Sequence, residues 1–248
     1  MLASVRKWQG LALIAALASS TLWLGATGQL ELYIAPRHVL FATTMSVIGL
    51  VAALGSALRL TVDHHAAQLS PWSSRLAAAA SATALIAAGT LLVLPPATLT
   101  SATATQRDIN STAIGDGGTA LTDAAGASSA AFANFSILDW ASLLKQTSDA
   151  GFYDGKAVAA VGFISEDPED PENMFYVSRF LITHCAIDAQ PVGVPVYLEN
   201  WKSTFAEDQW IEASGAFVTN RSQESSQPLV LLPDDITGID QPADPYLY

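Results

Sequence analysis

KAVAAVGFISEDPEDPENMFYVSRFL, residues 156–181, is the stretch that decides the fold of the C-terminal half of this chain. Two runs rich in Val, Phe, Tyr and Ile flank a loop of Asp, Pro and Glu, a pattern typical of two strands joined by a turn. Similar runs follow, and the predicted strands cover residues 156–164, 174–185, 194–198, 210–218 and 229–232. Five short strands in about 75 residues favour a small all-β barrel of the oligonucleotide/oligosaccharide-binding (OB) type. An immunoglobulin-like sandwich, with about seven strands, is the alternative.

A short helix is predicted to lead into these strands. It begins near Leu138, with Ser136 as the N-cap residue and Asp139 three positions later, which approximates a capping box. Within the strands, Gly162 and Gly215 mark positions where a strand is expected to bend sharply. The sequence thus predicts a β-rich domain over residues 135–248 with a helical entrance.

The N-terminal part has a different pattern, with three stretches that lack Asp, Glu, Lys and Arg. They cover residues 8–30, 39–58 and 76–94. Each is close to the roughly 20 residues that a transmembrane helix needs to cross a hydrocarbon core of about 30 Å. We therefore expect a three-span transmembrane region over residues 1–96. A cleaved signal peptide is the alternative for the first stretch, and a surface helix is the alternative for the Ala-rich third.

The placement of Lys and Arg predicts the orientation of the spans. Arg6 and Lys7 precede the first span, and Arg59 and Arg75 flank the loop between the second and third, whereas the loop between the first and second contains only Arg37. By the positive-inside bias, the N-terminus is expected in the cytoplasm and the C-terminal domain outside it. The expected location is therefore the cell membrane, as a multi-pass protein.

Charge separates the two halves as sharply as hydropathy does. Residues 138–248 contain five Lys or Arg against eighteen Asp or Glu, a net charge of −13. Such a domain should be repelled by nucleic acid, although OB folds often bind it, because single-strand binding combines aromatic rings with a basic groove. Residues 97–134, rich in Ala, Ser, Thr and Gly, are expected to form a linker since they offer little apolar surface to bury.

Four segments carry a resemblance to a known family. They are YIAPR at 33–37, PP with LTS at 95–101, RFLITHCAIDAQPVGVPV at 179–196, and PYLY at 245–248. Together they resemble the YcgQ-like family of bacterial membrane proteins, whose members are encoded beside a multi-span permease. The resemblance implies a membrane subunit that partners a permease, and it implies no enzymatic activity and no established cofactor.

The segment around Cys185 departs from that family in one respect. Family members often carry a Cys-Cys pair followed by Ala-x-Asp-Ala, whereas here His184 precedes Cys185 and Asp188 follows. This single cysteine excludes an internal disulfide. Imidazole, thiolate and carboxylate are competent ligands for zinc or a similar divalent ion, so His184, Cys185 and Asp188 are the candidate metal site. The alternatives are a packed cysteine and an aspartate that caps a turn.

Catalytic motifs are absent from the sequence: it has no hydrolase elbow, phosphate-binding glycine loop, paired metalloprotease histidines or kinase signature. We therefore expect a non-enzymatic integral membrane accessory subunit of a permease, in contact with the lipid bilayer and with the permease. Small residues in the second span, Gly49, Ala53, Ser56 and Ala57, would let a partner helix approach closely. A membrane-anchored exported module that binds metal or senses a ligand is the alternative function.

Overall fold

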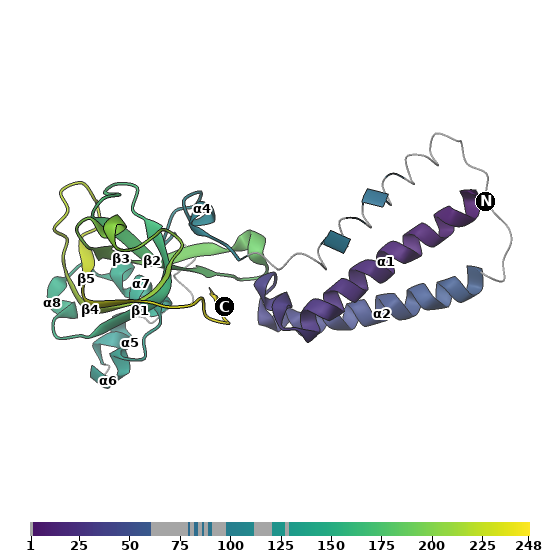
Figure 1. Cartoon of the computed structure of the whole chain (residues 1–248). Coiled ribbons are helices and arrows are strands. Elements are labelled where there is room, and N and C mark those ends of the chain that lie inside the picture. The colour runs from purple at the N-terminus through teal and green to yellow at the C-terminus, as the bar shows by residue number, and fades with distance from the viewer. Residues whose placement is uncertain are drawn as a thin grey trace. The chain divides into compact units, whose positions relative to one another are not determined.

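The computed structural model describes residues 2–60, 79, 82–83, 86, 89–90, 98–111, 121–126 and 129–248. By their contacts these residues form two compact units. Unit 1 comprises Met1–Ala97 together with His184–Ala186, and unit 2 comprises Thr98–Thr183 and Ile187–Tyr248. Figure 1 shows helices in the first and a sheet with short helices in the second.

Unit 1 is built on two helices, α1 (Leu2–Ala26) and α2 (Pro36–Leu60), separated by the short 3-10 helix η1 (Gln29–Leu32). The segment Pro36–Leu58 of α2, with a mean hydropathy of 1.9, is long and apolar enough to cross a membrane. The apolar part of α1, Gly10–Ala26, is shorter. Most of the predicted third span, residues 76–94, lies outside the described residues.

The two helices pack side by side (Figure 1) through small residues. A Cβ on Gly49 would lie 3.8 Å from Cγ2 of Ile14, and one on Gly25 would lie 2.8 Å from Cγ2 of Thr43. Ala53 is buried, whereas Ser56 is exposed. The close approach expected at Gly49 and Ala53 is therefore made to α1 of the same chain, because the absence of bulk on that face lets the two backbones come together.

Unit 2 enters its sheet through short helices. These are α4 (Ser101–Ala104), α5 (Leu121–Ala125), α6 (Ser129–Phe132), α7 (Ile137–Gln146) and α8 (Ala150–Tyr153). The predicted capping box of α7 is confirmed, because the Ser136 hydroxyl accepts from the Asp139 amide and the Asp139 carboxylate accepts from the Ser136 amide at 2.9 Å. Such a cap contributes about 1 kcal/mol to helix stability.

Six strands form one sheet. They are β1 (Val158–Glu166), β2 (Met174–Leu181), β3 (Gln190–Tyr197), β4 (Trp210–Thr219), β5 (Leu229–Gly238) and β6 (Tyr246–Leu247). All five predicted strands are confirmed, with shifted ends: β2 ends at Leu181 rather than at Cys185, and β5 runs six residues beyond Leu232. The two-residue β6, which pairs parallel to β2, was not predicted.

The pairings run β1-β4-β5-β3-β2 and return to β1, because β1 also pairs with β2. The N-terminal part of β1, Val158 to Phe163, pairs antiparallel with β4, and the part from Phe163 to Glu166 pairs antiparallel with β2. The β3–β5 pairing is parallel. β1 thus pairs with two strands, and the change from β4 to β2 occurs beside Gly162.

Glycines make the close approaches that this arrangement needs. A Cβ on Gly162 would meet the backbone of Ser178 on β2, with its carbonyl carbon at 2.9 Å. A Cβ on Gly215 would meet the backbone of β5, with Cα of Pro233 at 2.9 Å, and the β4–β5 register shifts between Ser214 and Gly215. Both glycines therefore lie where strands cross too closely for a side chain, in agreement with the sequence prediction of bends.

Large aromatic side chains from the helices and strands fill the interior of unit 2. Trp140 of α7 and Tyr153 of α8 are fully buried, and their rings lie 5.6 and 5.1 Å from that of Phe217 on β4. Trp201 is also buried, with its ring 5.2 Å from Phe175 of β2. Rings in such tilted arrangements add to the burial of their apolar area, and they fix α7 and α8 against the sheet.

The described part of the predicted linker is folded onto unit 2. The Asn110 side chain donates to the Gly193 carbonyl at 2.7 Å and accepts from the Gly193 amide at 2.9 Å, and the Asn110 amide donates to the Pro191 carbonyl. The Ser101 amide donates to the carboxylate of Asp208 at 2.6 Å. These hydrogen bonds attach Asn110 to β3 and Ser101 to Asp208, and they compensate for the small apolar content of residues 98–111.

Replacing Gly162 or Gly215 with Ala should lower the free energy of unfolding by about 2 kcal/mol or more, because each new methyl group meets backbone that cannot rotate away. Gly238→Ala is the matched control, since its Cβ would meet only the side-chain amide of Gln209. Denaturant titration of the full chain, followed by circular dichroism, measures the difference. Equal stability of the three variants would contradict the double pairing of β1.

Candidate functional site

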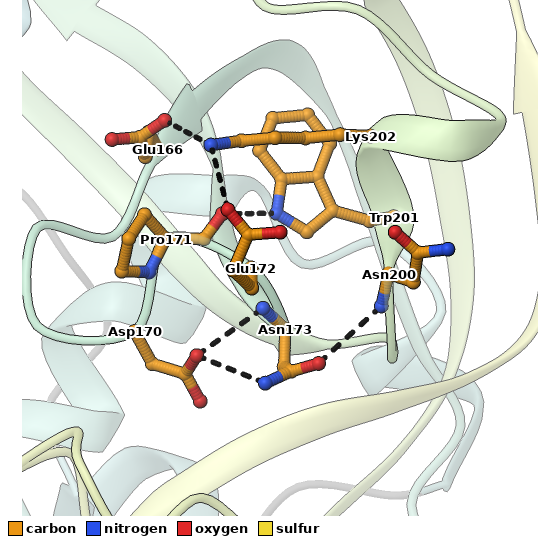
Figure 2. Close-up of polar contacts among 8 residues, drawn as sticks. All are labelled: Glu166, Asp170, Pro171, Glu172, Asn173, Asn200, Trp201 and Lys202. Atoms are coloured by element: carbon orange, nitrogen blue, oxygen red, sulfur yellow. Dashed lines mark hydrogen bonds and ion pairs between the residues drawn. The ribbon is translucent and has the colours of Figure 1, made fainter.

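The loop between β1 and β2 carries a dense group of acidic residues. Asp170, which is buried, accepts from the amide and the side chain of Asn173 at 3.2 and 3.1 Å. The side-chain oxygen of Asn173 in turn accepts from the amide of Asn200 at 3.4 Å, as Figure 2 shows. Asn200 adopts a left-handed backbone with φ of 54° just before η4 (Trp201–Ser203). The acidic loop and η4 are thereby joined.

Lys202 and Trp201 make further contacts between the acidic loop and η4 (Figure 2). The Lys202 ammonium lies 2.7 Å from Glu166 and 3.9 Å from Glu172. Its hydrogen bond to Glu166 raises the pKa of Lys202. The Trp201 indole N–H donates to the Pro171 carbonyl at 3.2 Å. These contacts attach the acidic loop to η4, while the buried Asp170 holds the loop through Asn173.

The loop between β4 and β5 supplies serines to the same carboxylates. The hydroxyl of Ser222 donates to Asp170 at 2.6 Å, that of Ser225 to Asp167 at 3.1 Å, and that of Ser226 to Glu169 at 2.6 Å. We call these six residues the acid–serine cluster. The bonds from the Ser226 hydroxyl and amide lower the pKa of Glu169. Hydroxyl donors let several carboxylates lie close together while remaining ionised.

A cavity of about 290 Å³ opens beside the acid–serine cluster. Its walls come from three places in the sequence: residues 104–109, the acidic loop from Glu166 to Glu169, and Tyr176 with Ser226 and Gln227. A second cavity, of about 230 Å³, reaches α7 and shares Ile109, Tyr176 and Gln227 with the first. The two cavities are neighbours, because these three residues line both. Both depend on residues that were predicted to be a linker.

The predicted metal residues divide between the two units. His184 and Cys185 belong to unit 1, where Ile34 and Cys185 form an antiparallel bridge and the His38 and His184 rings stack with centroids 5.9 Å apart. Asp188 belongs to unit 2 and accepts from the Thr183 amide at 3.2 Å. Among the described residues, no three His, Cys, Asp or Glu side chains are grouped so that they could hold a metal ion. A metal at His184, Cys185 and Asp188 stays a prediction.

Parts of three of the four segments that carry the resemblance meet in unit 2. The Arg179 guanidinium donates to the carbonyl groups of Asp244 and Pro245, and the Ile182 amide donates to the Leu247 carbonyl at 2.9 Å. The Tyr246 hydroxyl accepts from the Leu99 amide at 2.8 Å. Burial lowers the pKa of Arg179, although the nearby Asp244 opposes that shift. The C-terminal residues are thus fastened to β2 and to the segment that begins unit 2.

A family profile matches the part of the chain that contains this site. Residues 125–248, half of the chain, match the family described as the DUF1980 C-terminal domain. The chain belongs to this family. The DUF1980 C-terminal domain as matched covers α7, all six strands and the acid–serine cluster, but it begins after residues 98–111, which form one wall of the larger cavity. No curated protein matched the chain.

The sequence analysis overlooked the acid–serine cluster. Acidic residues in Pro-bounded loops are solvated by default, yet Asp167 and Asp170 are only 1 and 4% exposed. One signal was present: the Ser-rich loop at 222–226 has the hydroxyl donors that clustered carboxylates need. Which acid each serine contacts depends on the approach of the β1–β2 and β4–β5 loops, which local sequence does not specify.

Asp170→Ala should lower the free energy of unfolding by about 2 kcal/mol, because the half-buried donors of Asn173 and Ser222 lose their acceptor. Glu224→Ala, which removes an exposed carboxylate from the same pair of loops, is the control and should change stability little. Thermal melting of the full chain compares them. An Asp170→Ala chain as stable as the control would show that the cluster does not hold the loops together.

Proposed function

We propose that this chain is a non-enzymatic accessory subunit of a membrane permease, anchored by its N-terminal helices and acting through unit 2. The observation that carries the proposal is the division of one chain into an apolar helical unit and a separate compact, acidic β-domain. An anchor paired with an acidic domain suits a protein that presents a binding surface beside a membrane. The resemblance to proteins encoded beside a permease supports the choice of partner.

The orientation in this proposal follows from the distribution of basic residues. Three spans, the third at residues 76–94, would place the N-terminus in the cytoplasm and unit 2 outside it. Arg6, Lys7, Arg59 and Arg75 would then lie on the cytoplasmic side. A net charge of −13 over residues 138–248 is compatible with a solvated domain that stays away from anionic lipid headgroups.

The proposed shape of unit 2 is a small barrel of the OB type. The return of the strand pairings to β1 and the parallel β3–β5 pairing support it. In that fold, ligands bind through the loops after the first and fourth strands, which here carry the acid–serine cluster. Because these loops are acidic, we propose that the domain recognises a protein surface or small molecule rather than nucleic acid.

The exposed face of α2 is the proposed contact with the permease. Large apolar side chains such as Phe41, Ile48 and Val51 are exposed on it, and Ala52, Gly55 and Ser56 are exposed as well. A Cβ on Gly55 would meet nothing within 4 Å. Small residues on an apolar helix let a second helix approach closely. This face would therefore dock a permease helix, while the face with Gly49 packs on α1.

Affinity purification of the full chain in mild detergent tests the proposal. We expect a multi-span protein to copurify, and we expect Gly55→Leu to reduce its recovery at least about threefold while leaving the chain in the membrane fraction. Gly10→Leu is the control, since a Cβ on that exposed glycine of α1 would also meet nothing within 4 Å.

Three results would contradict this account. They are recovery of the chain in the soluble fraction, purification without a multi-span partner, and equal loss of the partner in both glycine variants. A reporter fused after Tyr248 adds the orientation: activity characteristic of the cytoplasm would contradict export of unit 2.

A further inference from the structure

In the larger cavity of unit 2, two hydrogen-bond donors have no partner among the described residues. Tyr176 is only 6% exposed and lines the cavity, and within the described part of the chain its hydroxyl makes no hydrogen bond. Nη1 of Arg107 is also buried without a partner, although Nη2 donates to the Ile187 carbonyl at 3.1 Å. Buried polar groups are nearly always satisfied in native proteins. Arg107 and Tyr176 line the same cavity from different walls, and the buried Arg107 nitrogen indicates a missing acceptor there.

The Tyr176 hydroxyl is protonated at neutral pH and can therefore donate a hydrogen bond. Burial, reinforced by the carboxylates of Asp167 and Glu169, raises the pKa of Tyr176. The hydroxyl therefore keeps its proton and can donate it to an oxygen of a bound molecule. The Arg107 guanidinium is a cation whose N–H donors form a rigid fork. Together they suit a carboxylate, which accepts strong hydrogen bonds from charged and neutral donors.

The other residues that line the larger cavity disfavour the binding of a simple anion. Asp108, Glu166, Asp167 and Glu169 also line the cavity, so four carboxylates oppose the single guanidinium. Both oxygens of Asp167 already accept hydrogen bonds, from the Glu169 amide and the Ser225 hydroxyl. Glu169 uses one oxygen, Oε2, for Ser226. Its other oxygen and the exposed Asp108 carboxylate remain available for a cation.

We propose that this cavity binds a small zwitterion of the α-amino acid class. The ligand carboxylate would accept from Tyr176 and Arg107, and its ammonium group would lie against Glu169 and Asp108. The volume of about 290 Å³ is at the small end for ligand cavities in proteins. The second cavity beyond Tyr176 and Ile109 would accommodate the side chain. This site lies within unit 2 and does not depend on the permease.

Thermal melting of the full chain in detergent with each of the twenty protein amino acids, at about 10 mM, provides the first test. We expect at least one to raise Tm. Two truncated analogues should raise Tm less: the amine that lacks the carboxylate of that amino acid, and the acid that lacks its amino group. Each analogue leaves part of the charged lining of the cavity without a partner. The proposal is overturned if none of the twenty raises Tm, or if either truncated analogue is as effective.

Calorimetric titration of the effective amino acid into variants provides the second test. Tyr176→Phe, Arg107→Met and Glu169→Gln should each weaken binding at least about tenfold, since each removes a hydrogen bond to a charged group. Tyr176→Phe should melt no lower than the parent without ligand, because that hydroxyl has no partner in the part of the chain that the structure describes. Tyr197→Phe is the matched control. The Tyr197 hydroxyl donates to Glu199, neither residue lines the cavity, and ligand binding should be unchanged. Unchanged binding in Tyr176→Phe, or equal loss in Tyr197→Phe, would overturn the site.

Discussion

The structure of unit 2 depends on β1 having two partners. Its first residues pair with β4 and its last with β2, and the change takes place beside Gly162, whose missing side chain lets the backbone of Ser178 approach. Because β1 joins β2 to β4, the strand pairings form a circuit. That circuit brings the loop after β1 and the loop after β4 together. The acid–serine cluster and the larger cavity exist only where these loops meet.

The second constraint on unit 2 is the repulsion between its clustered carboxylates, which serine hydroxyls reduce. A group of carboxylates in two neighbouring loops would repel one another unless donors surrounded them. The hydroxyls of Ser222, Ser225 and Ser226, together with Asn173, provide those donors without adding positive charge. The domain therefore combines an acidic surface with a fixed geometry of its loops.

Local sequence predicted most of the sheet and the N-terminus of α7. Alternating apolar residues located all five main strands, and the Ser136 cap is a purely local signal. The second half of β5 was missed because Pro233, Asp234 and Asp235 look like a turn, although this segment still pairs with β4. The strand β6 was missed because it owes its existence to a distant contact, in which Arg179 holds the carbonyl groups of Asp244 and Pro245.

The candidate site was harder to predict because its parts come together only through tertiary contacts. Residues 98–111 have the composition of a linker, yet two hydrogen bonds between Asn110 and Gly193 attach them to β3 and make them a cavity wall. Gly49 and Ala53 were correctly interpreted as a surface for close helix packing, but the helix that packs there is α1. Composition indicates what a segment can do, and the fold decides which segment it meets.

Hydrogen exchange on the full chain in detergent, with residue-level resolution, tests the double pairing of β1 most directly. We predict that the amides of β1 that take part in the ladders on both sides of Gly162, toward β4 and toward β2, exchange slowly and together, since they belong to one cooperative unit. Slow exchange before Gly162 combined with fast exchange from Ser165 to Glu166 would show that β1 and β2 are not paired. The circuit of strands would then be open, and the cavity would lose its support.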